Sequence, residues 1–164
     1  MKTEIMEVCN QEMKKKEGKN KGFSLVELIV VIAIMAILAI VIAPQVMKYI
    51  GQSRSSVDET NKSLYQTAAT TALADEGVYK EIAVLNENLV ITISSDASGD
   101  IVTSYTKGTK DGADATVKDF KEEFDNILNG TYPLPKEAGK SKFEIKINVS
   151  SSGEIGKVEV KSIP

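Results

Sequence analysis

The residues best placed for chemistry are Gly22, Phe23 and Glu27, at the start of the longest apolar run in the sequence. From Leu28 to Ala43 no side chain is polar, so Glu27 is a carboxylate beside an apolar segment. Placing a carboxylate in a membrane helix costs about 2.5–3.5 kcal/mol, so the residue needs water or a cation. A cut between Gly22 and Phe23 would supply a cation, because a free α-amino group is mostly protonated at neutral pH.

Residues 23 and 27 lie one helical turn apart, so the new amine and the carboxylate share one face of a helix. This leaves two arrangements open: the two groups neutralise each other within one chain, or the amine of one chain reaches the carboxylate of a staggered neighbour. The simpler alternative is that Glu27 lies near the helix end and extends its carboxylate to the membrane surface.

The elements around this pair point to a bilayer. From Phe23 onward there are about 21 apolar positions, close to the roughly 20 that a membrane-spanning helix needs. The run has no polar face, which disfavours the alternative of a buried helix in a globular protein. Five lysines between residues 14 and 21 predict a cytoplasmic N-terminus. A cut after Ala43 would need a scissile bond to Pro44, so we expect the apolar segment to be retained.

The motif Gly-Phe-Ser-Leu-Val-Glu-Leu at residues 22–28, followed by an apolar helix, resembles the type III signal of type IV prepilins and the related pseudopilins. Pro44 falls where many members have a helix-bending proline, and the resemblance covers residues 14–50. It implies that a prepilin peptidase cuts after Gly22 and N-methylates Phe23. It further implies that Glu27 guides assembly with identical or related pilin subunits, served by an assembly platform and an ATPase.

The composition narrows the classes of protein to which the chain could belong. The 164 residues allow one modest soluble domain besides the membrane segment. Residues 1–22 hold six Lys and four Glu, and the rest holds 14 basic and 19 acidic residues, which disfavours nucleic-acid binding. The only cysteine is Cys9, upstream of the expected cut, so the mature chain resembles the cysteine-free pilins of Gram-positive bacteria. With no histidine and no phosphate-binding or nucleophile motif, we expect no cofactor, no metal and no enzymatic activity.

Downstream of Pro44 the sequence becomes amphipathic. We expect one helix from about Phe23 to Asp75, capped by Gly77. This prediction divides the chain into a cleaved cytoplasmic leader (1–22), a membrane and filament-core half (23–44), an amphipathic half (45–76) and a soluble headgroup (77–164). The apolar stripe predicted to pack on the headgroup consists of Val46, Ile50, Val57, Leu64, Ala68 and Ala72, with Arg54, Asp58, Glu59 and Lys62 elsewhere on the helix.

The headgroup pattern predicts an α+β fold, with the long helix packed on a small antiparallel sheet. Residues 78–110 are predicted as loop and a hairpin with strands at 89–93 and 101–106. Asp111 or Asp114 would cap a second helix ending near Leu128 and Gly130. Two alternating strands, 143–149 and 157–161, follow a turn-rich connector at 132–135. Asp96, Asp100, Asp111 and Asp114 invite a calcium hypothesis, but their spacing does not match an EF-hand loop.

These features predict a structural subunit of a type IV pilus, first anchored in the cytoplasmic membrane by a single pass and then part of an extracellular filament for adhesion, motility or biofilm. One alternative is a pseudopilin of a type II secretion or DNA-uptake system. Another is a membrane-tethered binding domain that never polymerises.

Overall fold

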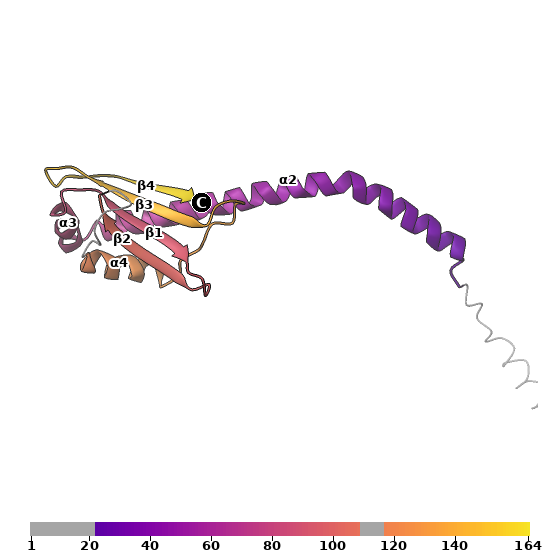
Figure 1. Ribbon diagram of the computed structural model, residues 1–164, viewed down its shortest axis with the longest axis horizontal. Helices are drawn as coiled ribbons and strands as arrows, with labels where there is room; N and C mark the ends of the chain where they lie inside the picture. Colours follow the sequence, from indigo (N-terminus) through magenta and orange to yellow (C-terminus); the bar gives the residue numbers. More distant parts are fainter. Residues whose placement is uncertain (1–21, 109–116) are drawn as a thin grey trace, which may run out of the picture. The chain divides into compact units, whose positions relative to one another are not determined.

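The computed structural model describes residues 22–108 and 117–164, which form two compact units that divide after Gln45. The Lys-rich leader with Cys9, and the acidic residues Asp111 and Asp114, lie outside the described residues. The first unit contributes the N-terminal part of helix α2, and the second contains the rest of α2 and the sheet (Figure 1).

Helix α2 runs from Leu25 to Ala72, which confirms the predicted long helix. The N–H of Leu28 donates to the carbonyl of Ser24 at 3.2 Å, the first bond of the helical series. Pro44 lies inside the helix. Proline has no N–H to donate, so the helix lacks one backbone bond there.

The predicted end of this helix at Asp75, with Gly77 as its cap, is wrong. The carboxylate of Asp75 accepts bonds from the N–H groups of Gly77 and Val78, at 2.8 and 3.1 Å, and so begins a separate helix, α3, from Glu76 to Ala83. The loop predicted from residue 78 onward is therefore wrong for residues 78–83. Val78 and Ile82, four residues apart, bury the inner face of α3.

The sheet has four antiparallel strands in the order β2-β1-β3-β4. Their bounds are Leu89–Ser95 for β1, Ile101–Lys107 for β2, Lys142–Val149 for β3 and Ile155–Ile163 for β4. The predicted hairpin and the two C-terminal strands are therefore confirmed. Buried and half-buried residues alternate strictly along β3, which explains why its alternating sequence predicted a strand.

Helix α4 runs from Lys118 to Leu128. The predicted cap by Asp111 or Asp114 is wrong, because the N-cap is Val117, which makes no side-chain capping bond. The carboxylate of Glu81 on α3 takes that role, accepting from the N–H groups of Asp119 at 3.2 Å and Phe120 at 2.8 Å. A carboxylate from another helix thus satisfies two N–H donors in the first turn of α4.

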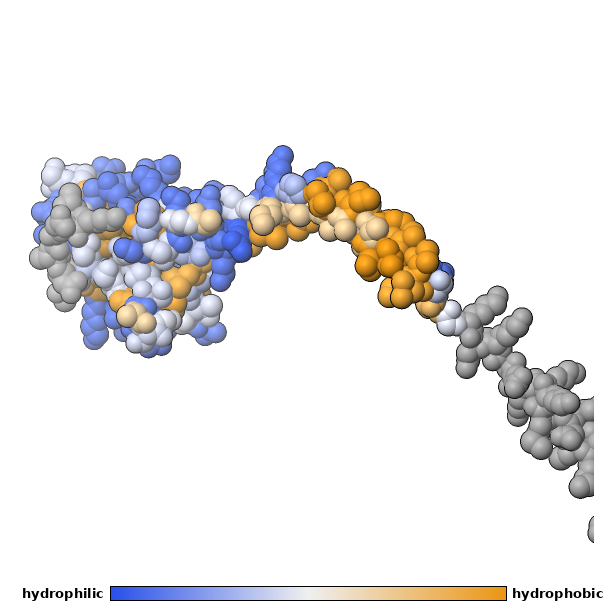
Figure 2. Space-filling model, turned by 45° about the vertical axis from the view of Figure 1, so that its right-hand side comes forward, coloured by the Kyte–Doolittle hydropathy of each residue, from blue (hydrophilic) through white to orange (hydrophobic). Residues whose placement is uncertain are grey.

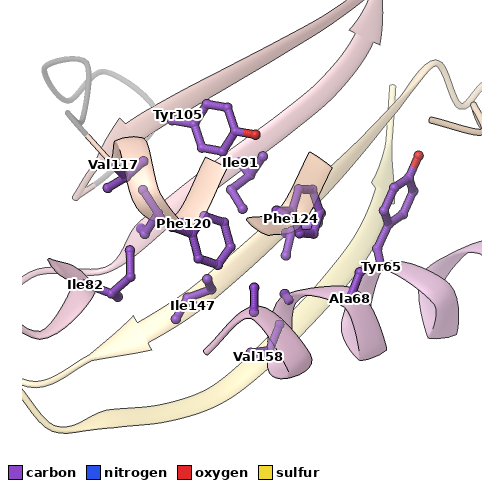
Figure 3. Close-up of a cluster of buried hydrophobic side chains, with 14 of the residues drawn as sticks. Tyr65, Ala68, Ile82, Ile91, Tyr105, Val117, Phe120, Phe124, Ile147 and Val158 are labelled. Carbon is purple, nitrogen blue, oxygen red and sulfur yellow. The ribbon is translucent and has the colours of Figure 1, made fainter. Parts of the chain in front are cut away.

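The core joins the C-terminal part of α2, both short helices and one face of the sheet (Figure 3). Phe120 and Phe124 of α4 stack with ring centroids 5.5 Å apart, and the ring of Tyr65 from α2 lies 5.4 Å from that of Phe143. The headgroup is therefore an α+β fold built on an antiparallel sheet, as predicted.

Candidate functional site: the exposed faces of helix α2

The N-terminal part of α2 buries no side chain in the described chain. Every large apolar residue from Leu25 to Ile42 is exposed, and hydrophobic residues cover most of the visible surface of this segment (Figure 2). The helix is long and apolar enough to cross a bilayer. Exposure on all sides is what a helix surrounded by lipid or by other helices shows, and a helix of a globular core does not.

Three of the residues singled out in the sequence lie together at the start of α2. Gly22 and Phe23 precede the helix in irregular, exposed backbone, and Glu27 lies in the first helical turn. The Gly22–Phe23 bond therefore lies outside the helical hydrogen-bond series. Because α2 begins at Leu25, the one-turn relation between the amine of Phe23 and Glu27 stays a prediction for the cut chain. Pro44, the fourth residue, lies within α2.

The amphipathic part of α2 packs on the headgroup through a different face from the one predicted. Ala68 and Ala72 are buried, as expected, together with Asp58, Tyr65 and Ala69. The other four residues of the predicted stripe do not pack on the headgroup, so this part of the prediction is wrong. Each is between 43 and 46% exposed, and we call this set the outer stripe: Val46, Ile50, Val57 and Leu64. The residue that packs over the sheet is Tyr65, whose ring lies 5.4 Å from that of Phe143, whereas Leu64 beside it is exposed.

Asp58, predicted to lie outside the packing stripe, is 1% exposed and is the only buried charged residue among the described ones. Its two carboxylate oxygens accept bonds from the backbone N–H groups of Lys136 and Glu137, at 2.6 and 3.0 Å. Seven residues further along the helix, the hydroxyl of Tyr65 donates to the carbonyl of Pro133 at 2.7 Å. Two polar residues of α2 thus hold the connector that leads into β3.

Three tyrosines line the region between α2, α4 and the connector. Burial raises the pKa of Tyr65. Burial also raises the pKa of Tyr105, and the negative charge of Asp125 adds to that shift. The pKa of Tyr132 is raised by burial and by its hydrogen bond to Asp125. All three hydroxyls are therefore held in their neutral form, which suits a structural role.

The calcium hypothesis finds no support in the residues that the structure describes, where no three acidic, histidine or cysteine side chains form a metal-binding group. The Asp96 carboxylate instead accepts bonds from the N–H groups of Ser98 and Asp100, at 2.8 and 2.9 Å, and so shapes the β1–β2 turn.

Comparison with known proteins places the similarity at the start of α2 and extends it into the headgroup. Residues 18–43 match the family model described as the prokaryotic N-terminal methylation motif. The chain is 33% identical to the type IV major fimbrial protein FimA of Dichelobacter nodosus over 116 residues, 68% of this chain and 70% of that protein.

Two further relatives are named as a prepilin peptidase-dependent protein and as a type IV pilin. The prepilin peptidase-dependent protein A of Clostridium perfringens is 28% identical over 134 residues, which cover 81% of this chain and 89% of that one. The type IV major pilin protein PilA of Myxococcus xanthus is 34% identical over 65 residues, 40% of this chain and 30% of that protein. No solved structure matches the chain.

Proposed function

The chain belongs to the type IV pilin family, whose members are structural proteins, and we propose that it is a subunit of a type IV pilus. The observation that carries the proposal is the apolar surface of α2 from Leu25 to Ile42, which has no partner in the described chain. In the precursor this surface lies in the membrane, and in the filament it packs against the same helix of other subunits. Adhesion, motility and biofilm formation are the roles proposed for the filament.

In the proposed pathway, residues 1–22 form a cytoplasmic leader and the headgroup lies across the membrane. A prepilin peptidase cuts after Gly22 and N-methylates the amine of Phe23. An assembly platform and its ATPase then move the subunit from the bilayer into the filament. The relative from Clostridium perfringens, named for its dependence on a prepilin peptidase, supports the processing step.

Assembly exchanges one apolar environment for another, so burial of the helix adds little net hydrophobic free energy. Specificity must therefore come from packing and from polar groups. We assign this role to Glu27, whose carboxylate pairs with the amine of Phe23 in a neighbouring subunit. Because an unpaired carboxylate is costly in the apolar core of a filament, only staggers that bring the two charges together are stable.

A second apolar surface supports polymerisation. The outer stripe belongs to the unit that contains the headgroup, and it stays exposed when that unit is folded. An exposed apolar stripe on a soluble domain is a candidate interaction site. In a filament, neighbouring subunits would cover it.

The alternative is a pseudopilin of a secretion or DNA-uptake system. The signal and the helix fit both, but two relatives are named as major pilin or major fimbrial proteins, which favours a pilus. Electron microscopy of cells separates the two functions, since a pilus extends as long surface filaments and a pseudopilus stays short.

The test is a Glu27→Val variant beside Ile34→Val, a conservative change in the same apolar segment. N-terminal sequencing should find both variants cut before Phe23. Glu27→Val should leave subunits in the membrane and reduce surface filaments at least about tenfold, whereas Ile34→Val should assemble normally. Normal filament yield from Glu27→Val would remove the assigned role of the carboxylate. An intact leader on the wild-type surface protein would favour the membrane-tethered binding domain instead.

A further inference from the structure

The charges on α2 bracket a segment of defined length. Between Glu27 and Lys48 the chain has 20 residues without an acidic or basic side chain. At about 1.5 Å per residue these residues give roughly 30 Å of helix, the thickness of the hydrocarbon core of a bilayer. Lys48 is exposed, so its ammonium group is available at the outer end of this segment.

Tyr49, the next residue, differs from the other tyrosines of the chain. It is 67% exposed, whereas Tyr65 and Tyr105 lie in the headgroup core, Tyr132 packs against that core and Tyr79 is 40% exposed. The ring of Tyr49 thus does not belong to the core of the folded headgroup. A tyrosine next to a lysine at the end of an apolar helix has the chemistry of the membrane interface, where the ring meets the acyl chains and the hydroxyl meets water.

Apolarity alone does not define where the membrane segment ends. Val46, Met47 and Ile50 continue the apolar surface beyond Pro44, and all three are exposed. A helix that is apolar on both sides of its expected boundary is free to shift along the membrane normal. Interfacial aromatic and basic residues are the groups that fix such a helix in depth.

We propose that Lys48 and Tyr49 bind the phospholipid headgroup layer of the outer leaflet and set the depth of the subunit before assembly. The ammonium of Lys48 pairs with lipid phosphate, and the ring of Tyr49 lies in the glycerol region beneath it. With the outer end fixed, the 20 uncharged residues before Lys48 are the part of the chain available to fill the hydrocarbon core. The inference rests on the proposed membrane-anchored precursor, and the partner is the lipid surface.

The chain has no tryptophan, so one substitution introduces a unique fluorophore. The full chain is inserted into vesicles of phosphatidylcholine and phosphatidylglycerol that contain lipids brominated either near the carbonyl groups or near the chain ends. Tyr49→Trp should emit at shorter wavelength than free tryptophan and be quenched most strongly by bromine near the carbonyls. Tyr79→Trp, on the headgroup, should escape both quenchers.

A third variant, Leu38→Trp, reports insertion by itself, because residue 38 lies near the middle of the uncharged segment. Quenching of Trp at position 38 by bromine near the chain ends shows that the helix spans the bilayer. If this signal is absent, the proposed membrane-anchored precursor fails. If it is present while the fluorophore at position 49 escapes quenching, or is quenched chiefly by the chain-end bromine, the headgroup anchor alone is overturned.

The contribution of Lys48 is tested in the Tyr49→Trp background. Lys48→Glu should lose the preference for carbonyl-region quenching when phosphatidylglycerol is present, because the new carboxylate is repelled by anionic headgroups. Lys62→Glu makes the same charge change in the headgroup-packed part of α2 and should leave the quenching profile unchanged. Identical profiles for Lys48→Glu and its parent would exclude the lysine from the anchor.

Discussion

Asp58 and Lys136 are joined by a 2.6 Å hydrogen bond, in which the backbone N–H of Lys136 donates to the buried carboxylate. The other oxygen of Asp58 accepts from the N–H of Glu137. Residues 58 and 136 are far apart in the sequence, so this carboxylate ties the long helix to the connector before β3. No basic side chain is paired with it among the described ion pairs.

We expect Asp58→Ala to lower the free energy of unfolding by about 2 kcal/mol, because two backbone donors lose their acceptor. Asp58→Asn keeps one acceptor oxygen and should cost less. The matched control is Glu59→Ala, which changes the adjacent, exposed carboxylate and should stay within about 0.5 kcal/mol of wild type. Urea unfolding of the detergent-solubilised chain measures all three. Equal effects at positions 58 and 59 would contradict the role given to Asp58.

Much of the headgroup was predictable because its signals are local. The alternation along β3 follows directly from the side-chain periodicity of a strand, and this strand lies where the sequence placed it. Helix α4 ends at Leu128 as predicted but begins later than predicted, at Lys118. The start of α2 was predictable for the same reason, since a long apolar run without a polar face leaves few structural choices.

The wrong predictions concern residues whose burial or secondary structure depends on tertiary contacts. Asp58 is buried because a distant connector supplies two N–H donors, which its own helical segment does not reveal. Helix α3 was missed because it has only eight residues and a glycine in its first turn, at Gly77. The outer stripe was wrongly predicted to pack on the headgroup, because an apolar pattern shows that a helix face needs a partner but does not identify that partner.

Glu81 provides the second prediction, since its carboxylate caps α4 from α3. Glu81→Ala leaves the first donors of α4 without this acceptor, and we expect a loss of about 1 kcal/mol, the usual value of a helix cap. Glu122→Ala removes an exposed carboxylate from α4 itself and serves as the control. Chemical denaturation with tryptic cleavage near residue 118 as a second readout should show α4 opening first in Glu81→Ala only. Equal cleavage of the two variants would show that the cap is dispensable.

Alkaline pH provides the third prediction. The pKa values of Tyr65, Tyr105 and Tyr132 are raised in the folded headgroup, chiefly by burial. In the unfolded chain each hydroxyl titrates near its ordinary value of about 10. The unfolded state therefore releases protons first as the pH rises, so stability is retained below about pH 10 and falls above it.

Urea unfolding at a series of pH values, with tyrosinate absorbance as the second signal, measures this loss. The Tyr65→Phe variant removes one of the three groups, so its stability should decline less steeply above pH 10. Its stability at neutral pH should be lower by about 1 kcal/mol, because the carbonyl of Pro133 loses its donor. Ionisation of all three hydroxyls while the headgroup stays folded would contradict the prediction.

The outer stripe gives the last prediction, which separates folding from assembly. Leu64 is half-exposed and lies outside the buried core, so Leu64→Glu should change the free energy of unfolding by less than about 1 kcal/mol. If a neighbouring subunit covers the stripe, the new carboxylate is buried without a partner in the filament and assembly should fall sharply. Gln66→Glu introduces the same charge at an exposed polar position two residues away and should assemble normally.

Filament yield by electron microscopy, measured beside membrane subunit levels, distinguishes the two variants. Equal piliation would mean that the stripe faces solvent in the filament, and the contact between subunits would then be confined to the N-terminal part of α2.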